Sequence, residues 1–159
     1  MTERPLPRIW PCELTAELRD DLHQWCCLWN VESLVREMSV TISRRMTSSL
    51  GRANFRRKSI GLQHTLLDPS ATQLLREVLC HEAAHLAAYE LHGMKIRPHG
   101  PQWRELLAAA GYPPRATIAA ATLPQCFANS FANRKPRVVR RRRATRRSPW
   151  KILARWIGG

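Results

Sequence analysis

The apolar positions of the first forty residues recur every three or four residues, as they do along one face of a helix. The first series consists of Leu18, Leu22, Trp25 and Trp29. Thr15 precedes this series and is a suitable N-cap, because its hydroxyl can accept a hydrogen bond from a free backbone N–H of the first turn. A second helical segment is predicted over residues 31–38. Residues 1–13, which are punctuated by prolines, are expected to form an extended arm.

Between residues 40 and 66 the period changes, and apolar residues alternate with polar ones as in half-buried strands. The alternation predicts three short strands, over residues 40–46, 52–57 and 58–66, with Gly51 ending the first connection. Short strands that follow one another closely are most simply paired as an antiparallel sheet. We therefore expect a small antiparallel three-stranded sheet in an α+β fold.

The helical period returns after Asp68 and continues for about six turns. Asp68 and Pro69 form a typical helix start, with Asp as N-cap and Pro at the first helical position. Gly93 is a suitable terminator. A further helix is predicted from Pro101 to Ala110, with Trp103 on its apolar face, and an alanine-rich segment over 116–122 is expected to form one more short helix.

The long helix carries the sequence HEAAH at positions 81–85. Two histidines four residues apart lie one turn apart on the same helix face, so His81 and His85 can reach one divalent ion, usually zinc. Glu82 lies beside them and can accept a proton from a water molecule that the ion activates. This motif predicts a metal-dependent hydrolase.

A catalytic zinc site needs a third protein ligand and an open position. His92 lies seven residues beyond His85, roughly 10 Å along the helix axis, which is too far to share the ion. Glu105 lies on the following helix, and His99 lies in the loop before it. Spacing alone leaves both Glu105 and His99 open as the third ligand.

The charge of the chain is unevenly distributed. The formal net charge is +14, yet all 12 acidic residues occur at or before Glu105, where 14 basic residues nearly balance them. The remaining 12 basic residues lie at Arg115 and beyond, without an acidic one. The sequence therefore predicts a nearly neutral globular domain over 14–118 and a flexible, basic tail over 119–159, which attracts polyanions.

The tail has three interpretations. It can be a solvated charge run that serves solubility. It can bind nucleic acid through phosphate contacts without sequence preference, which the excess of arginine favours. The arginines concerned are Arg140, Arg141, Arg142, Arg143, Arg146 and Arg147. Its end, with Trp150 and Trp156 at helical spacing beside Lys151 and Arg155, can instead dock on a partner or an anionic membrane surface.

The cysteine content and the N-terminal residues indicate in which cellular compartment the protein is expected. The chain has five cysteines, an odd number, and no CxxC pair, which argues against a disulfide framework and a cysteine-based zinc ribbon. Residues 1–13 lack the apolar core of a signal peptide, and no apolar run approaches transmembrane length. We expect a cytoplasmic protein, associated with the nucleoid if it is bacterial.

The segment 79–103 resembles the SprT-like family, the Spartan-related HExxH zinc metalloproteases, through HEAAH at 81–85, HG at 92–93 and HGPQW at 99–103. Weaker matches are Trp29-Asn30, Gly51-Arg52-Ala53, Ile60-Gly61-Leu62 and Leu66-Leu67, so the resemblance covers about residues 25–115. It implies a zincin-like fold in which the sheet packs on the metal helix. It also implies that His81, His85 and His99 bind Zn²⁺ and that Glu82 is the general base.

The resemblance further implies proteolysis, and in the eukaryotic member of the family the substrates are proteins crosslinked to DNA. Many members carry a C-terminal Cys-rich zinc ribbon; only Cys126 lies in the corresponding region, so this chain resembles a short form without it. We expect a protease acting on DNA-associated proteins, with the arginine-rich tail supplying DNA binding. The alternative is a non-catalytic nucleic-acid-binding protein that retains a structural metal.

Overall fold

A computed structural model describes residues 6–47, 49–116 and 123–127. The fold is α+β. In chain order its helices and strands are α1 (Ala16–Leu28), α2 (Glu32–Glu37), β1 (Ser39–Ser43), β2 (Gly51–Asn54), β3 (Ser59–Gln63), α3 (Thr72–His92) and α4 (Pro101–Ala109). Short 3₁₀ turns are formed by His64–Leu67, Pro69–Ala71 and Gln125–Phe127. The short helix expected over 116–122 and most of the basic tail lie outside the described residues.

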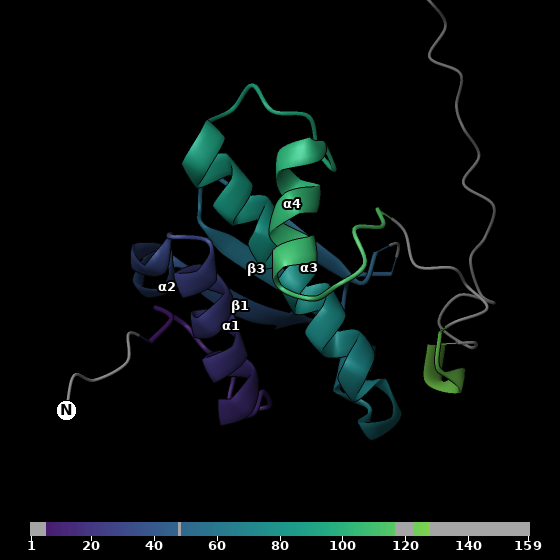
Figure 1. The fold of residues 1–159 in the computed structure, drawn as a ribbon. Helices are drawn as coiled ribbons and strands as arrows, with labels where there is room; N and C mark the ends of the chain where they lie inside the picture. The colour runs from purple at the N-terminus through teal and green to yellow at the C-terminus, as the bar shows by residue number, and fades with distance from the viewer. Residues whose placement is uncertain (1–5, 48, 117–122, 128–159) are drawn as a thin grey trace, which may run out of the picture.

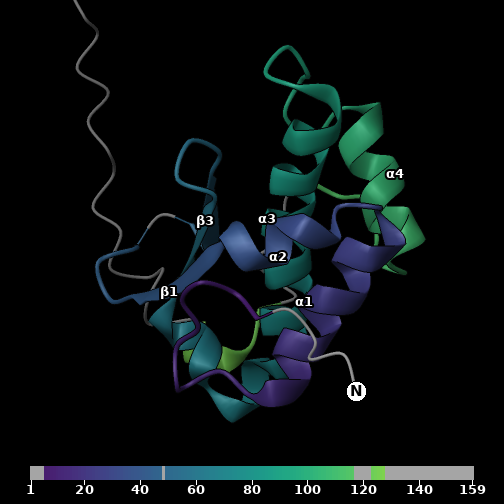
Figure 2. The same ribbon diagram turned by 90° about the vertical axis from the view of Figure 1, so that its left-hand side faces the viewer.

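Helix α3 lies at the centre of the fold, with the sheet on one side and α1 and α4 on the opposite side (Figures 1 and 2). This position explains why α3 is apolar around most of its circumference. Its buried residues include Leu75, Val78, Leu79, Ala83 and Leu86. Because α3 is held on both sides, side chains that project from it have fixed positions.

The predicted helix starts and ends are largely confirmed. The Thr15 hydroxyl accepts a hydrogen bond from the Leu18 N–H at 3.5 Å, as expected of an N-cap. The Asp68 carboxylate accepts from the Ser70 N–H at 2.9 Å, but it caps the 3₁₀ turn Pro69–Ala71, and α3 itself begins at Thr72. Gly93 ends α3 with a φ of 75°, a conformation that glycine adopts without steric cost.

The predicted antiparallel sheet is wrong in one of its two pairings. The strand order is β1-β3-β2: β2 pairs with β3 antiparallel, whereas β1 pairs with β3 parallel. The sheet is therefore mixed. Strand β3, with Ile60 and Leu62 fully buried, takes the centre, and the more polar β2 takes an edge. The predicted strand over 52–57 is also too long, because Phe55 lies in the turn after β2.

The two edges of the sheet differ. The N-terminal arm runs along β1: the Arg8 N–H donates to Met38 O at 2.8 Å, and the Val40 N–H donates to Ile9 O at 2.9 Å. Strand β2 has no strand partner on its outer side within the described chain. The sheet therefore presents one free edge, and this edge is the one beside α3.

Candidate metal centre

Three histidine side chains converge between α3 and the loop that precedes α4. His81 and His85 project from one face of α3, as predicted, and His99 reaches them from the loop. The Nε2 atom of His99 lies 3.1 Å from Nε2 of His85 and 3.2 Å from Nε2 of His81. These ring nitrogens form a possible metal-binding group.

This geometry fits a zinc ion better than hydrogen bonds. Nitrogen ligands at about 2.0–2.1 Å from a tetrahedral zinc ion lie about 3.3 Å from one another, close to both observed separations. A neutral imidazole carries a single N–H, so Nε2 of His99 can donate to only one of its two neighbours. Among the described residues, no further His, Cys, Asp or Glu side chain joins this group. Three ligands and an open position are typical of catalytic zinc.

The loop before α4 is shaped to present His99. His99 has a φ of 57°, in the left-handed region that non-glycine residues seldom occupy. The next N–H, of Gly100, donates to Arg97 O at 2.9 Å and closes the turn. A Cβ at Gly100 would lie 2.8 Å from the same oxygen, so only glycine fits there. Pro101 then starts α4.

Trp103 contacts the rings of all three histidines. The sequence placed it on the apolar face of a helix, which did not indicate this role. Its ring centroid lies 4.7 Å from that of His81, 5.2 Å from that of His85 and 4.6 Å from that of His99. Its Nε1 donates to His81 O at 3.3 Å, and the side chain is fully buried. The one sequence signal for this role is the position of Trp103 in the HGPQW segment, four residues after His99.

Burial keeps the histidines in the neutral form that binds metals. Desolvation, reinforced by the neighbouring His99, lowers the pKa of His81 to about 4. Desolvation and the charges of the other two histidines lower the pKa of His85 to about 3. The pKa of His99 is also lowered, first by burial and then by Arg104. All three rings therefore offer a lone pair near neutral pH.

Glu82 lies beside the histidines, buried between α3 and β2. Burial raises the pKa of its carboxyl group to about 7, although a hydrogen bond from the backbone of Ala53 and the charge of Arg52 act in the opposite direction. A carboxyl group with a pKa near the working pH can both accept and return a proton. The electrostatic environment therefore suits the general base that the motif predicts.

Gly51 allows β2 to approach Glu82 closely. A Cβ on Gly51 would lie 2.7 Å from Cγ and 2.8 Å from Oε1 of Glu82, and 2.8 Å from Cγ1 of Val78. Such distances are shorter than van der Waals contact, so either the strand or the carboxylate would have to move. In the sequence, Gly51 was visible as the end of a turn and as part of a weak family match, but neither showed this close approach to Glu82.

We expect Gly51→Ala to destabilise the fold by about 1–3 kcal/mol, as overpacked sites do, and to displace the Glu82 carboxylate. Thermal unfolding measures the first effect, and an assay for the predicted peptidase activity measures the second. Gly61→Ala is the matched control in the same sheet, because its Cβ would come no closer than 3.4 Å to any neighbouring atom, the flexible end of Met46. Equal unfolding midpoints for the two variants would contradict the tight packing of β2 on Glu82.

The other candidate ligands lie outside the cluster. Glu105 is exposed on α4, and His92 is exposed in the last turn of α3. Neither belongs to the histidine group. The fold thus brings His99 to His81 and His85 and leaves Glu105, which the spacing had also allowed, in solvent.

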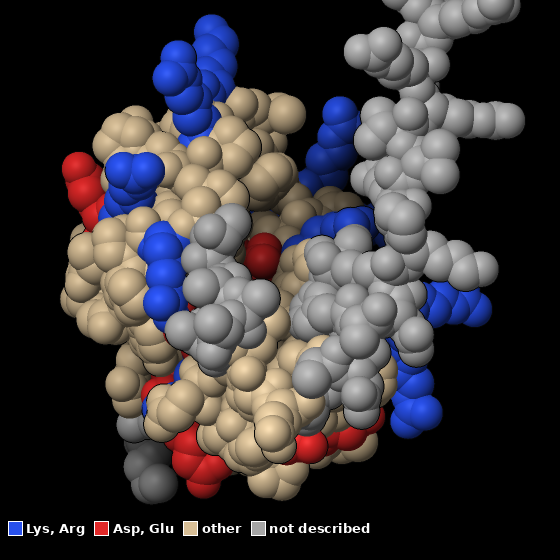
Figure 3. Space-filling view, turned by 90° about the vertical axis from the view of Figure 1, so that its right-hand side faces the viewer, with Lys and Arg blue, Asp and Glu red and all other residues tan. Residues whose placement is uncertain are grey.

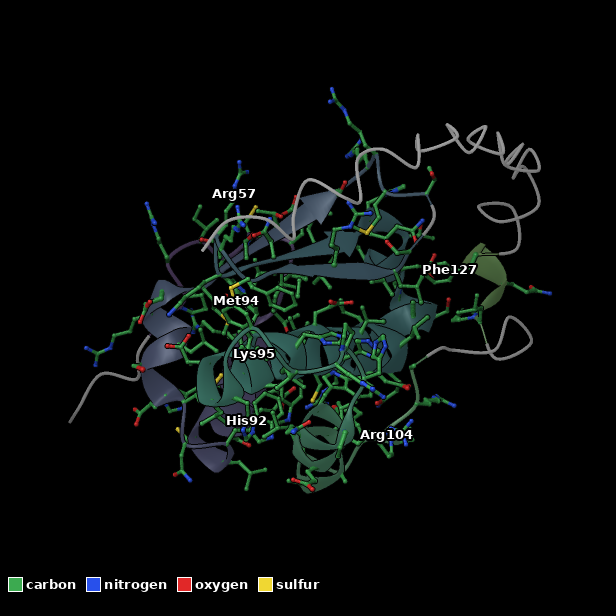
Figure 4. The ribbon with its side chains drawn as sticks, turned by 90° about the horizontal axis from the view of Figure 1, so that it is seen from above. Arg57, His92, Met94, Lys95, Arg104 and Phe127 are labelled. Atoms are coloured by element: carbon green, nitrogen blue, oxygen red, sulfur yellow. The ribbon has the colours of Figure 1, made fainter. Side chains whose placement is uncertain are left out.

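On the face shown in Figure 3, lysine and arginine side chains stand around a central hollow in which an acidic side chain is visible, and the other acidic side chains gather mainly at the lower end. Figure 4 shows Arg57 on the sheet side of α3 and Arg104 on the α4 side. The positive charge of Arg52 acts to lower the pKa of Glu82, and that of Arg104 acts to lower the pKa of His99. The arginines predicted to bind nucleic acid, at 140–143, 146 and 147, lie outside the described residues.

Within the described part of the chain, no helix is long and apolar enough to span a membrane.

Comparison with known proteins points to one family. The family model of the SprT-like family matches residues 18–122, which include α3, β2 and the His99 loop. Protein SprT of Vibrio parahaemolyticus is 35% identical over 69 residues, 43% of this chain and 41% of that protein. Protein SprT of Glaesserella parasuis is 26% identical over 95 residues, 60% of this chain and 58% of that protein. The chain thus matches less than two-thirds of the length of these relatives.

Because the family model covers well over half of the chain and spans the histidine cluster with its buried glutamate, the chain belongs to the SprT-like family.

Proposed function

We propose that this chain is a zinc-dependent endopeptidase that cleaves proteins associated with DNA. The observation that carries the proposal is the convergence of three histidine Nε2 atoms, about one zinc-ligand separation apart, beside the buried carboxylate of Glu82. Membership of the SprT-like family supports the same chemistry. A closed structural site would more often have four protein ligands.

In the proposed reaction, His81, His85 and His99 hold the zinc ion and Trp103 fixes the positions of their rings. Zinc, when bound, acts as a Lewis acid that activates water and polarises the scissile carbonyl. Glu82 accepts the proton of the attacking water and returns it to the nitrogen of the leaving amine. Its contact with the Ala53 N–H holds the carboxylate in place for both transfers.

The free edge of β2 is the expected docking place for the substrate backbone. The Gln63 N–H donates to Leu50 O at 2.8 Å, which makes this facing pair a hydrogen-bonded one. Such pairs alternate along an antiparallel ladder, so the backbone groups of Gly51 and Ala53 point away from β3. The Ala53 N–H already donates to Glu82, so a peptide would pair with the Gly51 N–H and with the carbonyls of both residues. An extended peptide can pair with this edge through its main chain. We therefore expect unfolded or flexible substrates and weak sequence preference.

The proposed DNA association rests on the basic tail, and we expect removal of residues 134–159 to weaken DNA binding strongly. Affinity for DNA should also fall steeply with salt in the full chain, by about 10³–10⁵ between 50 and 200 mM if 6–10 phosphates are contacted. Gel shifts on unrelated sequences test both points, and liposome flotation tests the membrane interpretation. Unchanged DNA affinity after the deletion, or binding to anionic liposomes alone, would rule out this role.

The activity is tested by zinc quantification together with cleavage of casein or histones, with and without single-stranded DNA. We expect one zinc ion at the histidine cluster and cleavage that depends on it. DNA should increase the cleavage of a DNA-bound substrate. Stoichiometric zinc without any cleavage, even in the presence of DNA, would instead support a non-catalytic nucleic-acid-binding protein.

A further inference from the structure

A second group of metal-ligand side chains lies at the corner between α1 and α2, on elements that do not contribute to the histidine cluster. It consists of His23 and Cys27 on α1 and Glu32 at the start of α2. His23 and Cys27 are four residues apart, the same spacing as His81 and His85. Their ligand atoms and a carboxylate oxygen of Glu32 all lie within 4.8 Å of one another.

The distances in this cluster fit a shared ion. His23 Nε2 lies 3.5 Å from Glu32 Oε1, and Cys27 Sγ lies 3.7 Å from each ring nitrogen of His23. Around a tetrahedral zinc ion, with bonds of about 2.0–2.3 Å, nitrogen and oxygen lie about 3.3 Å apart and nitrogen and sulfur about 3.6 Å. Because the sulfur is equally far from both ring nitrogens, it does not lie along the lone pair of either one, so metal binding requires the imidazole to turn.

The chemistry of the three side chains is also suitable. Imidazole, thiolate and carboxylate are all ligands that zinc accepts. One thiolate and one carboxylate balance the charge of a divalent ion. In the absence of an ion, burial and then the charge of Glu32 raise the pKa of the Cys27 thiol. Metal binding would therefore release the Cys27 proton to solvent and should strengthen as the pH rises.

The position of the cluster suggests what an ion would stabilise. The chain reverses between α1 and α2 at Asn30, which has a φ of 56°. The adjacent Trp29 is buried and its Nε1 donates to Leu106 O on α4 at 2.8 Å. An ion held by His23, Cys27 and Glu32 would tie the end of α1 to the start of α2 across this turn (Figure 1).

We propose that His23, Cys27 and Glu32 form a second binding site for a zinc-like divalent cation, which stabilises the α1–α2 corner. The site is independent of the proposed peptidase centre, since the two share no residue. It should bind ions that accept a thiolate ligand, whereas the histidine cluster offers only nitrogen ligands.

Cobalt(II) titration of the full-length protein under reducing conditions tests this proposal, because only a thiolate ligand gives a near-ultraviolet charge-transfer band. We expect two bound equivalents in the wild type, one of them with this band. Cys27→Ser should abolish the band and should bind one equivalent of cobalt fewer than the wild type. Glu32→Gln should weaken cobalt binding at the site that gives the band. His99→Ala should keep the band, so failure of the peptidase proposal leaves the result interpretable.

Cys12→Ser is the matched control, because Cys12 is likewise exposed but belongs to no such cluster. It should retain both equivalents and the band. Circular dichroism checks that each variant is folded. Zinc should raise the unfolding temperature of the His99→Ala variant. It should not raise that of the double variant His99→Ala, Cys27→Ser. A wild-type protein without the band, or a band that survives Cys27→Ser, would overturn the proposal.

Discussion

Glu82→Gln should lower peptidase activity by about 10²–10⁴-fold, the usual contribution of a general acid–base group, while zinc stays bound. Glutamine has nearly the same shape as glutamate but cannot accept the proton of the attacking water. None of the three histidines is altered, so the ligand set remains complete. Cleavage of casein or histones measures the first effect, and zinc quantification on the same sample measures the second.

Glu105→Gln is the matched control for this experiment. It makes the same chemical change to a carboxylate that is exposed on α4 and lies outside the histidine cluster. This variant should keep both its zinc and its activity. Full activity in Glu82→Gln would show that the proposed mechanism is wrong, and loss of zinc from it would mean that Glu82 supports the ion directly.

His99→Ala should weaken zinc binding by about two orders of magnitude or more and abolish cleavage. Zinc sites with four ligands bind with about 10–16 kcal/mol, so one ligand contributes roughly 3 kcal/mol, or about 100-fold. Removing His99 also exposes the other two rings to solvent and takes away one of the contacts around Trp103. Competition with a chelator of known affinity measures the loss.

His92→Ala provides the comparison for His99→Ala. His92 is exposed at the end of α3, outside the histidine group, so zinc affinity should not change. Comparing His99→Ala with Glu105→Ala also decides which of these two residues is the third ligand, a choice that the spacing left open. If His99→Ala keeps its zinc and Glu105→Ala loses it, the arrangement of the loop and α4 seen here is not the one that binds metal.

The helical part of the fold was largely predictable because its signals are local. Thr15 and Gly93 mark helix ends through their own backbone and side-chain chemistry, and the structure bears them out. Only the start of α3 shifted, because Pro69 begins a 3₁₀ turn before the α-helix. The apolar helix face predicted from Leu18, Leu22, Trp25 and Trp29 is likewise confirmed, because all four side chains are buried.

The sheet was less predictable because pairing is a long-range property. The alternation over residues 40–66 indicates strands but names no partner for any of them. Strand β3 pairs with both neighbours because its apolar residues Ile60 and Leu62 need burial at the centre. Strand β1 pairs with β3 in parallel, and the chain order alone gave no sign of it.

The sequence by itself determined the metal helix and its chemistry, because the spacing of His81 and His85 is converted into geometry by the helix alone. The spacing left His99 and Glu105 as alternatives, and only the resemblance to the SprT-like family favoured His99; neither signal revealed the roles of Gly51 and Trp103. Those depend on contacts between segments far apart in the chain: β2 against α3, and α4 beneath the histidine rings. Only tertiary packing fixes such contacts, so only the folded structure shows His99 beside His81 and His85, and Glu82 packed against β2.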